Sequence, residues 1–260
     1  MDIARQIAEI ALEQAVQHEC RGLLEIGPGK GAITLPILER WSAQASPALA
    51  QNFLLVERDF QLAANWAQTD SQPFSPKVIE GNFLDLLPEQ WLHQKPLAVV
   101  SNLPYSVGTA ILDLLARRWD EIPVMVLMFQ SEVAQRLRAA PSTSKRGSLS
   151  VWIQNRWDVQ KMLDVPPRAF LPPPDVHSEV VMLTRRKTPW VSFPADEGHE
   201  QLWEKVLKTC FAHRRKMLRS ILPWRNVLEE AGVDGTKRAE ALQWQEWDSL
   251  FQAVRRVTLL

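Results

Sequence analysis

Short apolar runs recur along the first half of this sequence, and each of them is followed at once by glycine or polar residues. Between the runs lie stretches with the apolar spacing of amphipathic helices, such as residues 2–18 and the segment from Ala32 towards Arg40. Strands that alternate with helices in this way form a mostly parallel α/β sheet with helices on both faces. The runs that we predict as its strands are residues 22–26, 53–56, 77–80, 97–100 and 124–129.

Three later apolar runs, at residues 149–153, 159–163 and 179–183, are predicted as further strands. The segment at residues 185–198 contains two prolines and mixed charge, which is typical of a linker. A chain of 260 residues is long enough for one α/β domain with a small second domain. We therefore predict a first domain at residues 1–184 and a second at residues 185–260.

The composition is that of a globular protein with a full core, with 46% apolar and 23% charged residues. No apolar run approaches the length of a membrane span, and the first residues lack the basic-then-apolar pattern of a signal peptide. Cys20 and Cys210 lie far apart, and neither has neighbours at metal-ligand spacing. We expect a cytoplasmic monomer with no metal, no disulfide and no membrane partner.

The run at residues 22–26 ends in a glycine-rich segment, Gly27-Pro-Gly-Lys-Gly31, and a predicted helix follows. In such a strand–turn–helix unit, glycines let the backbone pass close to a ligand at the start of the helix. The G-x-G-x-G spacing differs from the G-x-G-x-x-G of dinucleotide sites. It suits a nucleoside with a neutral or cationic tail, such as S-adenosylmethionine, and a plain tight turn is the alternative. We assign Glu25, Gly27, Gly29 and Gly31 to this predicted cofactor site.

An acidic residue ends the next predicted strand. Glu57 follows residues 53–56, where the ribose of a bound nucleoside would lie, and a carboxylate accepts hydrogen bonds well from two hydroxyl groups. A solvated loop glutamate is the alternative. Because the glycine run and this carboxylate fall in register at two strand ends, we predict that Glu57 and the adjacent Arg58 contact the cofactor.

Asn82 and Phe83 follow the third predicted strand, at residues 77–80. The side-chain oxygen of Asn82 can accept from the exocyclic amine of the cofactor's adenine. Phe83 can offer an apolar face and a backbone N–H. Asp85 is a rival for the amine contact, and a polar turn is the alternative for either residue.

The run at residues 97–100 ends in Ser101-Asn-Leu-Pro-Tyr105, a polar and aromatic step. The N6 of an adenine is a weak nucleophile because its lone pair is delocalised into the ring. The Asn102 side-chain oxygen and the Leu103 carbonyl would accept its two hydrogens and favour tetrahedral geometry, ready for direct displacement at a sulfonium methyl. Pro104 would fix the turn and Tyr105 would stack on the base. A paired base cannot reach such a pocket, so the target must be unpaired or flipped. A strand-ending turn with a core tyrosine is the alternative.

Seven short stretches, spread over nearly the whole chain, form a set. They are residues 24–31 (Leu-Glu-Ile-Gly-Pro-Gly-Lys-Gly), 101–105 (Ser-Asn-Leu-Pro-Tyr), 129–136 (Phe-Gln-Ser-Glu-Val-Ala-Gln-Arg), 146–151 (Arg-Gly-Ser-Leu-Ser-Val), 165–174 (Val-Pro-Pro-Arg-Ala-Phe-Leu-Pro-Pro-Pro), 211–219 (Phe-Ala-His-Arg-Arg-Lys-Met-Leu-Arg) and 238–240 (Arg-Ala-Glu). In content and order this set resembles the bacterial small-subunit rRNA adenine N6,N6-dimethyltransferase family. That family is related to the erythromycin-resistance rRNA methylases and the mitochondrial transcription factor B proteins.

The resemblance implies a Rossmann-like methyltransferase domain with a seven-stranded, mostly parallel sheet, followed by a small all-α domain that contacts rRNA. The implied reaction is S-adenosylmethionine-dependent N6,N6-dimethylation of adenines in small-subunit rRNA, with the pre-30S ribosomal particle as partner. The resemblance places cofactor contacts at Gly27, Glu57, Asn82 and Asn102. It also suggests that Phe170 stacks on the target adenine, opposite the tyrosine of the Asn-Leu-Pro-Tyr step.

Some features depart from the family's pattern. Members usually begin with a basic segment and a Gln-Asn/His-Phe-Leu stretch that closes over the site, so we expect a truncated N-terminus here. Asn82 stands where an aspartate is usual, and His177-Ser-Glu179 stands for Asp-Ser-Ala. A missing cover would weaken cofactor binding and admit water. Two functions remain open: an active rRNA adenine dimethyltransferase, and a weakly active or inactive paralogue that serves as a ribosome-assembly or RNA-binding factor.

The C-terminal part carries a modest positive excess, with 14 Lys and Arg against 10 Asp and Glu in residues 185–260. In a helix predicted over residues 200–221, apolar side chains share one side, and Lys208, Arg215 and Arg219 lie on another. Cations in such a row can follow a phosphate backbone, and a solvated basic face is the alternative. We predict that these three side chains contact rRNA.

Overall fold

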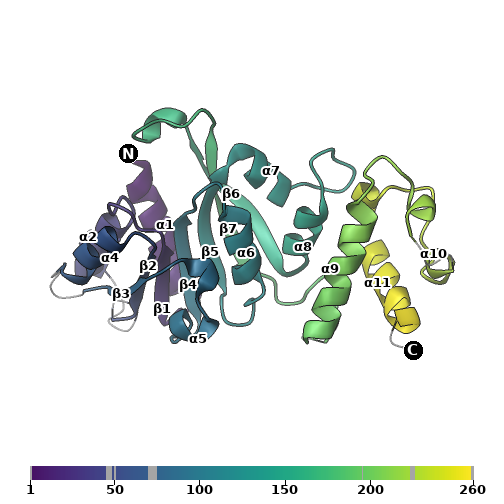
Figure 1. Ribbon diagram of the computed structural model, residues 1–260, viewed down its shortest axis with the longest axis horizontal. Helices are drawn as coiled ribbons and strands as arrows, with labels where there is room; N and C mark the ends of the chain where they lie inside the picture. Colours follow the sequence, from purple (N-terminus) through teal and green to yellow (C-terminus); the bar gives the residue numbers. More distant parts are fainter. Residues whose placement is uncertain are drawn as a thin grey trace. The chain divides into compact units, whose positions relative to one another are not determined.

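The computed structural model describes residues 2–44, 49, 51–69, 75–194, 196–222 and 226–258. The five predicted runs form parallel strands of one seven-stranded sheet (Figure 1). They are β1 (Gly22–Ile26), β2 (Phe53–Glu57), β3 (Lys77–Glu80), β4 (Leu97–Asn102) and β5 (Val124–Gln130). The other two are β6 (Trp157–Val165) and β7 (Ser178–Arg185), and β7 runs antiparallel to β5. The strand order is β3-β2-β1-β4-β5-β7-β6, which confirms the predicted mostly parallel sheet.

Helices connect the strands as the alternating pattern predicts. In chain order they are α1 (Ile3–Gln17), α2 (Thr34–Gln44), α4 (Phe60–Ala67), α5 (Pro88–Trp91), α6 (Gly108–Ala116) and α7 (Ser131–Leu137), with short 3-10 turns η1 (Phe83–Asp85) and η2 (Pro167–Ala169). Asp2 caps α1, because its side chain accepts from the Ala4 N–H. Helix α1 then buries one face built from Ile7, Ala8, Ala11 and Ala15.

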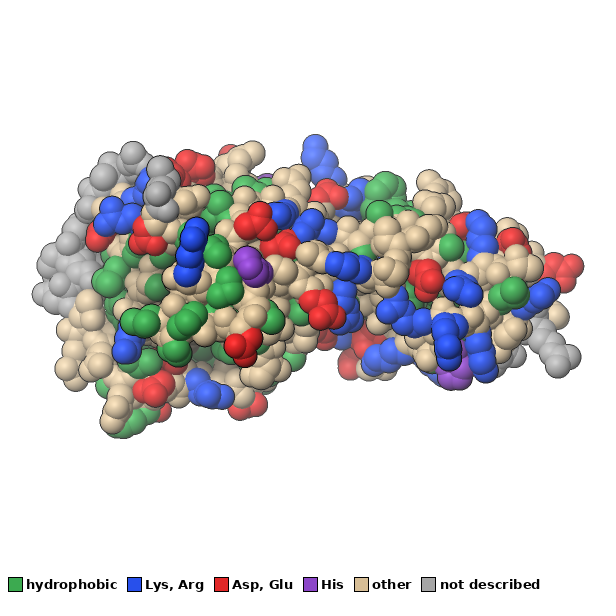
Figure 2. Space-filling view, turned by 90° about the horizontal axis from the view of Figure 1, so that it is seen from above, with side chains coloured by type: hydrophobic (Ala, Val, Ile, Leu, Met, Phe, Trp, Pro, Cys, Tyr) green, Lys and Arg blue, Asp and Glu red, His purple; other side chains and the backbone are tan. Residues whose placement is uncertain are grey.

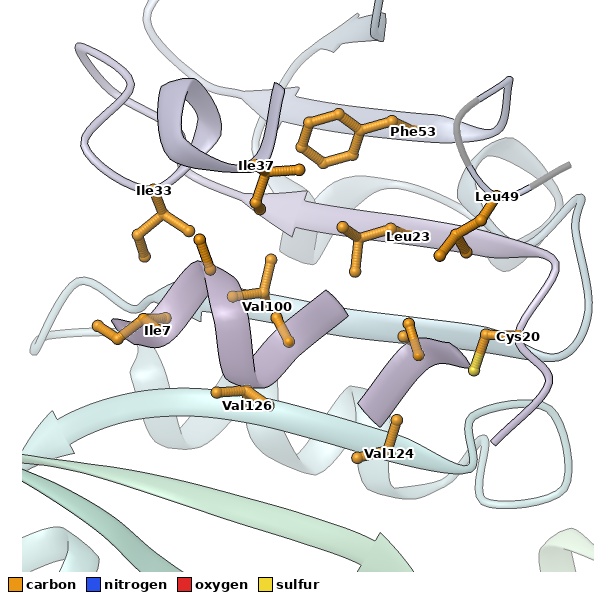
Figure 3. Close-up of a cluster of buried hydrophobic side chains, with 14 of the residues drawn as sticks. Ile7, Cys20, Leu23, Ile33, Ile37, Leu49, Phe53, Val100, Val124 and Val126 are labelled. Carbon is orange, nitrogen blue, oxygen red and sulfur yellow. The ribbon is translucent and has the colours of Figure 1, made fainter. Parts of the chain in front are cut away.

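The sheet's main core lies between these strands and helices α1 and α2. Figure 3 shows Leu23, Val100, Val124 and Val126 of three neighbouring strands lying around α1, and Ile7 of α1 is 2% exposed. The small alanines of α1 let this helix approach the sheet closely, and the β-branched residues fill the pleated surface. The packing fixes the strands, and so it fixes the loops that follow them.

The carboxyl ends of the parallel strands meet at one edge of the sheet. In the ladders, Ile26 pairs with Val56, Glu57 with Glu80, and Asn102 with Met128. The polar residues predicted at four separate strand ends are therefore brought to a common edge, as is usual for ligand sites of open α/β sheets.

The chain divides into two compact units. The first contains Met1–Ala134 and Asp158–Arg185, and the second contains Gln135–Trp157 and Arg186–Leu260. The second junction lies one residue after the predicted boundary, whereas residues 135–157 were predicted in the first domain and group with the second unit. A physical reason is the pair of hydrogen bonds between the Asn155 side chain and the Val191 backbone. Within the described ranges, no helix is both long and apolar enough to cross a membrane.

The second unit has its own helical core. Its helices are α8 (Ser148–Arg156), α9 (Glu197–Phe211), α10 (Val227–Glu230) and α11 (Trp244–Thr258), with η3 (Leu218–Ser220) and η4 (Ala239–Ala241) between them. Trp203 of α9 contacts Trp247 and Phe251 of α11 with ring centroids 5.8 and 5.2 Å apart. Buried aromatic pairs of this kind stabilise a small helical unit.

Two sequence predictions are wrong in this unit. Residues 149–153 belong to α8, not to a strand, because the Ser150 hydroxyl accepts from the Gly147 N–H and caps the helix start. The helix predicted over residues 200–221 ends at Phe211. Beyond it the N–H groups of Leu218 and Arg219 donate to Lys237 and Gly235, and these long-range bonds replace helical ones.

Candidate active site

The glycine-rich loop between β1 and α2 leaves one side of its backbone open. Gly27 and Gly29 have φ angles of +68° and +55°, a region that L side chains rarely adopt. A Cβ added at either glycine would meet no heavy atom within 4 Å. The open backbone is thus a cradle that any side chain would fill, which fits the close approach of a ligand.

Gly31, the last glycine of the loop, is required for a different contact. Its φ is +89°, and an added Cβ would lie 2.7 Å from two ring atoms of Trp66 on α4. The Trp66 Nε1–H also donates to the Gly29 carbonyl at 2.9 Å. Trp66 therefore packs against the glycine loop and holds it by a hydrogen bond. The sequence does not predict this contact, because nothing in the pattern of a helix shows which loop its tryptophan will meet.

This arrangement predicts different effects for two glycine substitutions. Gly31→Ala should lower the free energy of unfolding by about 1–3 kcal/mol, because the new methyl group overlaps Trp66. Gly29→Ala should cost only about 1 kcal/mol of backbone strain, yet it should weaken cofactor binding more. Denaturant unfolding and a cofactor titration measure both effects. Equal destabilisation by the two substitutions would contradict the assignment of Gly31 to packing against Trp66 and of Gly29 to the ligand side of the loop.

Glu57 shapes the same loop from the end of β2. Its Oε2 accepts from the Gly29 N–H and its Oε1 from the Asp59 N–H, both at 2.9 Å. The side chain is 7% exposed, whereas the adjacent Arg58 is exposed to solvent. Since each carboxylate oxygen can accept two bonds, both oxygens keep a lone pair for a ligand hydroxyl.

Glu25 lies near Glu57 inside the site and is 2% exposed. The Thr34 hydroxyl donates to its Oε2 at 2.8 Å. Burial raises the pKa of Glu25 to about 8, the Thr34 hydrogen bond opposes this rise, and the Glu57 charge adds to it. Glu25 is therefore expected to keep its proton at neutral pH, and ionising it in the folded protein would lower the stability.

The raised pKa of Glu25 predicts a pH-dependent stability. The unfolded chain releases this proton near the ordinary pKa of 4.5, whereas the folded chain keeps it until about pH 8. Folding should therefore become less favourable as the pH rises through that window, by up to about 5 kcal/mol. In Glu25→Gln this loss should disappear, so melting temperatures of the two proteins should diverge with pH. Parallel curves would exclude Glu25 as the cause.

The polar and aromatic residues that follow the third strand, from Asn82 to Asp85, form the 3-10 turn η1 and its cap. The Asn82 side chain donates to Asp85 at 2.9 Å, and its oxygen accepts from the Leu84 N–H at 3.4 Å. The two rivals for the predicted amine contact are thus bonded to each other. Phe83 is 3% exposed and its ring packs on Trp91 at 5.0 Å, so the ring belongs to the core. Of the two contacts predicted for Phe83, this leaves the one made by its backbone N–H.

The Ser-Asn-Leu-Pro-Tyr step ends β4. Ser101 is buried and its hydroxyl donates to the Ile26 carbonyl, which ties β4 to the start of the glycine loop. Asn102 and Pro104 are exposed at the sheet edge, whereas the Leu103 side chain is 1% exposed and anchors the step in the core. Tyr105 is 39% exposed, and its hydroxyl bonds with the Ser178 hydroxyl at 2.7 Å.

A pocket of about 460 Å³ opens beside this step in the first unit. It brings together Asn102 and the half-buried Phe170, which are far apart in sequence. It also contains Arg168, an exposed cation that sequence reasoning did not single out although it lies within the Pro-Arg-Ala-Phe stretch. The other lining residues are Asp2, Ile3, Ala4, Ile7, Ala32, Ile33, Met128, Val165, Pro166 and Ala169. A pocket of this size can hold a flat base.

The three predicted RNA-binding cations lie in the second unit, but not on one helix face. Lys208 is on α9 and pairs with Glu204 at 3.2 Å, Arg215 is in the exposed turn after α9, and Arg219 is in η3. His213, Arg214 and Lys216 are exposed in the same turn, and Figure 2 shows Lys and Arg side chains gathered over this part of the molecule. We call residues 213–219 the basic turn. Arg219 also lowers the pKa of Asp234, after the larger effect of the Thr236 hydrogen bonds.

Comparisons with known proteins bear on these features. The family model described as "Ribosomal RNA adenine dimethylase" matches residues 3–255. The chain belongs to the ribosomal RNA adenine dimethylase family. Among curated relatives, "Ribosomal RNA small subunit methyltransferase A" of Rhizobium etli (strain CIAT 652) is 35% identical over 253 residues, covering 93% of this chain and 87% of the relative. The protein of the same name from Agrobacterium fabrum is 37% identical over 236 residues, covering 88% and 80%.

Solved structures with the same fold include a dimethyladenosine transferase from Plasmodium falciparum, with a TM-score of 0.75 and 20% identity over 96% of each chain. The 23S rRNA methyltransferase ErmE has a TM-score of 0.65 at 23% identity, again over 96% of each chain. For this dimethylase, the expected Rossmann-like methyltransferase fold, the rRNA adenine dimethylase activity and S-adenosylmethionine as methyl donor are confirmed. The paralogue alternative is not favoured.

The open glycine cradle and the spare lone pairs of Glu57 fit a nucleoside that approaches the loop closely and presents hydroxyl groups to the carboxylate. Within the described part of the chain, no group of three or more His, Cys, Asp or Glu side chains could hold a metal ion. The residues at this edge therefore suit S-adenosylmethionine.

Proposed function

We propose that this dimethylase acts on adenines of small-subunit rRNA within the pre-30S particle, as a monomer in the cytoplasm. The small-subunit substrate is supported by the names of two relatives that this chain matches over most of their length. The observation that carries the proposal is the pocket at the end of β4, which joins a hydrogen-bond acceptor, Asn102, to an aromatic ring, Phe170.

The cofactor-binding role falls to the loops after β1, β2 and β3. The backbone at Gly27 and Gly29 passes the methionine end of the cofactor, and Gly31 holds the loop against Trp66. The free lone pairs of Glu57 accept from the ribose hydroxyls, with Arg58 beside them. Asn82 and the backbone N–H of Phe83 meet the adenine. When bound, S-adenosylmethionine supplies an electrophilic sulfonium methyl group.

The reacting nitrogen is held by the step after β4. The Asn102 side-chain oxygen and the Leu103 carbonyl accept the two N6 hydrogens, which raises the electron density on N6 and takes its lone pair out of conjugation with the ring. Pro104 keeps these two acceptors in a fixed turn. No general base is needed in this scheme, because the proton can leave after methyl transfer.

The target base lies between two rings in this proposal. Tyr105 stacks on one face of the flipped adenine and Phe170 on the other, which replaces the stacking lost from the RNA. Arg168 adds a positive charge to the same pocket, where it suits the phosphate of the flipped nucleotide. After the first transfer N6 keeps one hydrogen, which one of the two acceptors can hold while the second methyl group is added; the last proton leaves after that transfer.

The proposed substrate can be tested by comparing RNA at different stages of assembly. Unmethylated free small-subunit rRNA, small-subunit assembly intermediates, assembled small subunits and large subunits are each incubated with the protein and cofactor labelled in the methyl group. Label should enter small-subunit material and not large subunits, and assembly intermediates should be the best substrates. Equal labelling of large subunits would exclude the proposed target.

The cations of the second unit are tested separately. Changing Lys208, Arg215 and Arg219 together to Glu should weaken small-subunit binding by about tenfold or more and flatten its salt dependence, because fewer counterions are released. Binding is measured over a series of salt concentrations.

The matched control for this variant is Arg21, Lys77 and Lys95 changed together to Glu. These exposed cations lie at the amino ends of the strands, away from the site edge, and the change in net charge is the same. If the control weakens binding as much as the first variant, the effect is one of overall charge, and the assignment of the basic turn and Lys208 is wrong.

A further inference from the structure

Tyr105 is the only tyrosine in the sequence, and its hydroxyl is not needed for stacking. A phenylalanine ring would stack on a base equally well. In the structure that hydroxyl has a specific partner, the Ser178 hydroxyl at 2.7 Å. The bond joins two residues that are 73 positions apart, so a local turn does not explain it.

Ser178 is held firmly by the sheet. It is the first residue of β7, is 0% exposed, and pairs with Gln130 at the end of β5. Next to it, the Ser131 N–H donates to the His177 carbonyl at 2.9 Å. A buried hydroxyl on a paired strand is a rigid anchor, whereas the ring it holds is 39% exposed and would otherwise move between rotamers.

The position of Ser178 also links the two rings of the proposed base site. The segment at residues 166–177, which carries Phe170, runs from the end of β6 and returns to the sheet at Ser178. One buried serine therefore closes the segment of Phe170 and holds the ring of Tyr105. A substitution at Ser178 therefore removes the partner of the Tyr105 hydroxyl and also changes the point where the Phe170 segment joins the sheet.

We propose that Ser178 is a positioning residue for the methyl transfer: its hydrogen bond orients the Tyr105 ring so that the flipped adenine presents N6 to the acceptors on Asn102 and Leu103. The proposal rests on the proposed function. The alternative is that the bond only stabilises the fold. Positioning acts on the fraction of bound bases in reactive geometry, so it should affect kcat more than KM.

The kinetic test uses both ends of the bond. Ser178→Ala and Tyr105→Phe should each lower kcat about fivefold to tenfold, the rate equivalent of one hydrogen bond, with KM for the small subunit changed less than twofold. The double variant should be no slower than either single one, because both remove the same interaction. Ser178→Thr keeps the hydroxyl and should recover most of the rate. Ser106→Ala, an exposed serine beside Tyr105, is the matched control and should keep full activity.

A readout without catalysis is available because the chain has a single tyrosine. Protein labelled with ¹³C-tyrosine gives one set of ring signals, and these should shift and broaden in Ser178→Ala but not in Ser106→Ala. Melting curves establish that each variant is folded. Tyr105→Phe keeps the test open if Ser178→Ala fails to fold.

Additive rate losses in the double variant, or an unchanged kcat in Ser178→Ala, would overturn the proposal. So would a rise in KM as large as the fall in kcat. These outcomes are distinct from failure of the proposed function, in which the wild-type protein itself would transfer no methyl group to small-subunit rRNA.

Discussion

Asn102→Ala should lower the kcat of methyl transfer by about 10²- to 10³-fold. Asn102 is exposed at the end of β4 and lines the pocket, and we propose that its side-chain oxygen accepts from N6 as the charge on that nitrogen develops. Removing an acceptor that acts mainly in the transition state lowers kcat and kcat/KM together. The measurement is incorporation of labelled methyl groups into unmethylated small subunits under saturating conditions.

Two comparisons sharpen this prediction. Asn65→Ala, at an exposed asparagine on α4, controls for loss of an amide in general and should leave the rate unchanged. Binding of cofactor and of small subunits to Asn102→Ala should fall by less than about tenfold, because phosphate contacts and the other strand ends supply most of the affinity. A variant that loses binding and rate in equal measure would show that Asn102 serves binding instead of chemistry.

Glu57→Ala should raise the dissociation constant for S-adenosylmethionine by about 100-fold or more. Two hydrogen bonds from ribose hydroxyls to a carboxylate are lost at once, each worth about 1.5–3 kcal/mol. The substitution also releases the Gly29 and Asp59 N–H groups that Glu57 holds. Glu57→Ala is thus expected to change the shape of the glycine loop and to remove the hydrogen bonds to the ribose. Calorimetric titration of the folded variant with cofactor measures the effect.

Glu80 is the matched control for Glu57. It pairs with Glu57 in the β2–β3 ladder, ends the neighbouring strand and is exposed. Glu80→Ala removes the same charge from the same sheet edge, so an effect of overall charge would appear in both variants. We expect cofactor affinity to stay within about twofold of wild type in Glu80→Ala. A Glu57→Ala variant that binds cofactor normally would contradict the placement of the ribose.

Much of the first unit could be predicted from the sequence, because buried parallel strands are continuous apolar runs and their ends are polar. Residues 22–26 match β1, which is buried along its whole length, and residues 97–100 fall within β4, of which only Asn102 is exposed. The apolar run at residues 149–153 misled us, since a buried helix segment and a buried strand look alike over so few residues. In the structure this segment is a helix whose start is capped by a hydrogen bond from the Gly147 N–H to the Ser150 hydroxyl. The apolar pattern alone does not predict that bond.

The sequence predicts which residues form the candidate site, but it does not predict the contacts that hold them in place. Glycines, a carboxylate and an asparagine at successive strand ends indicate a nucleoside site from pattern alone. The bonds from Glu57 to the glycine loop, from Trp66 to Gly29 and from Tyr105 to Ser178 join distant parts of the chain. No spacing rule predicts such contacts, because tertiary packing creates them. The burial of Phe83 against Trp91 is another result of packing.

The most direct test of the account is the chemical identity of the methylated nucleoside. Unmethylated small subunits are treated with the wild-type protein and labelled S-adenosylmethionine, and the rRNA is digested to nucleosides and separated. We predict that the label appears as N6,N6-dimethyladenosine, with N6-methyladenosine as its precursor at short times, and that both are absent with Asn102→Ala. Label on a ribose, on a pyrimidine or on a ring nitrogen of adenine would contradict the pocket chemistry proposed for the end of β4.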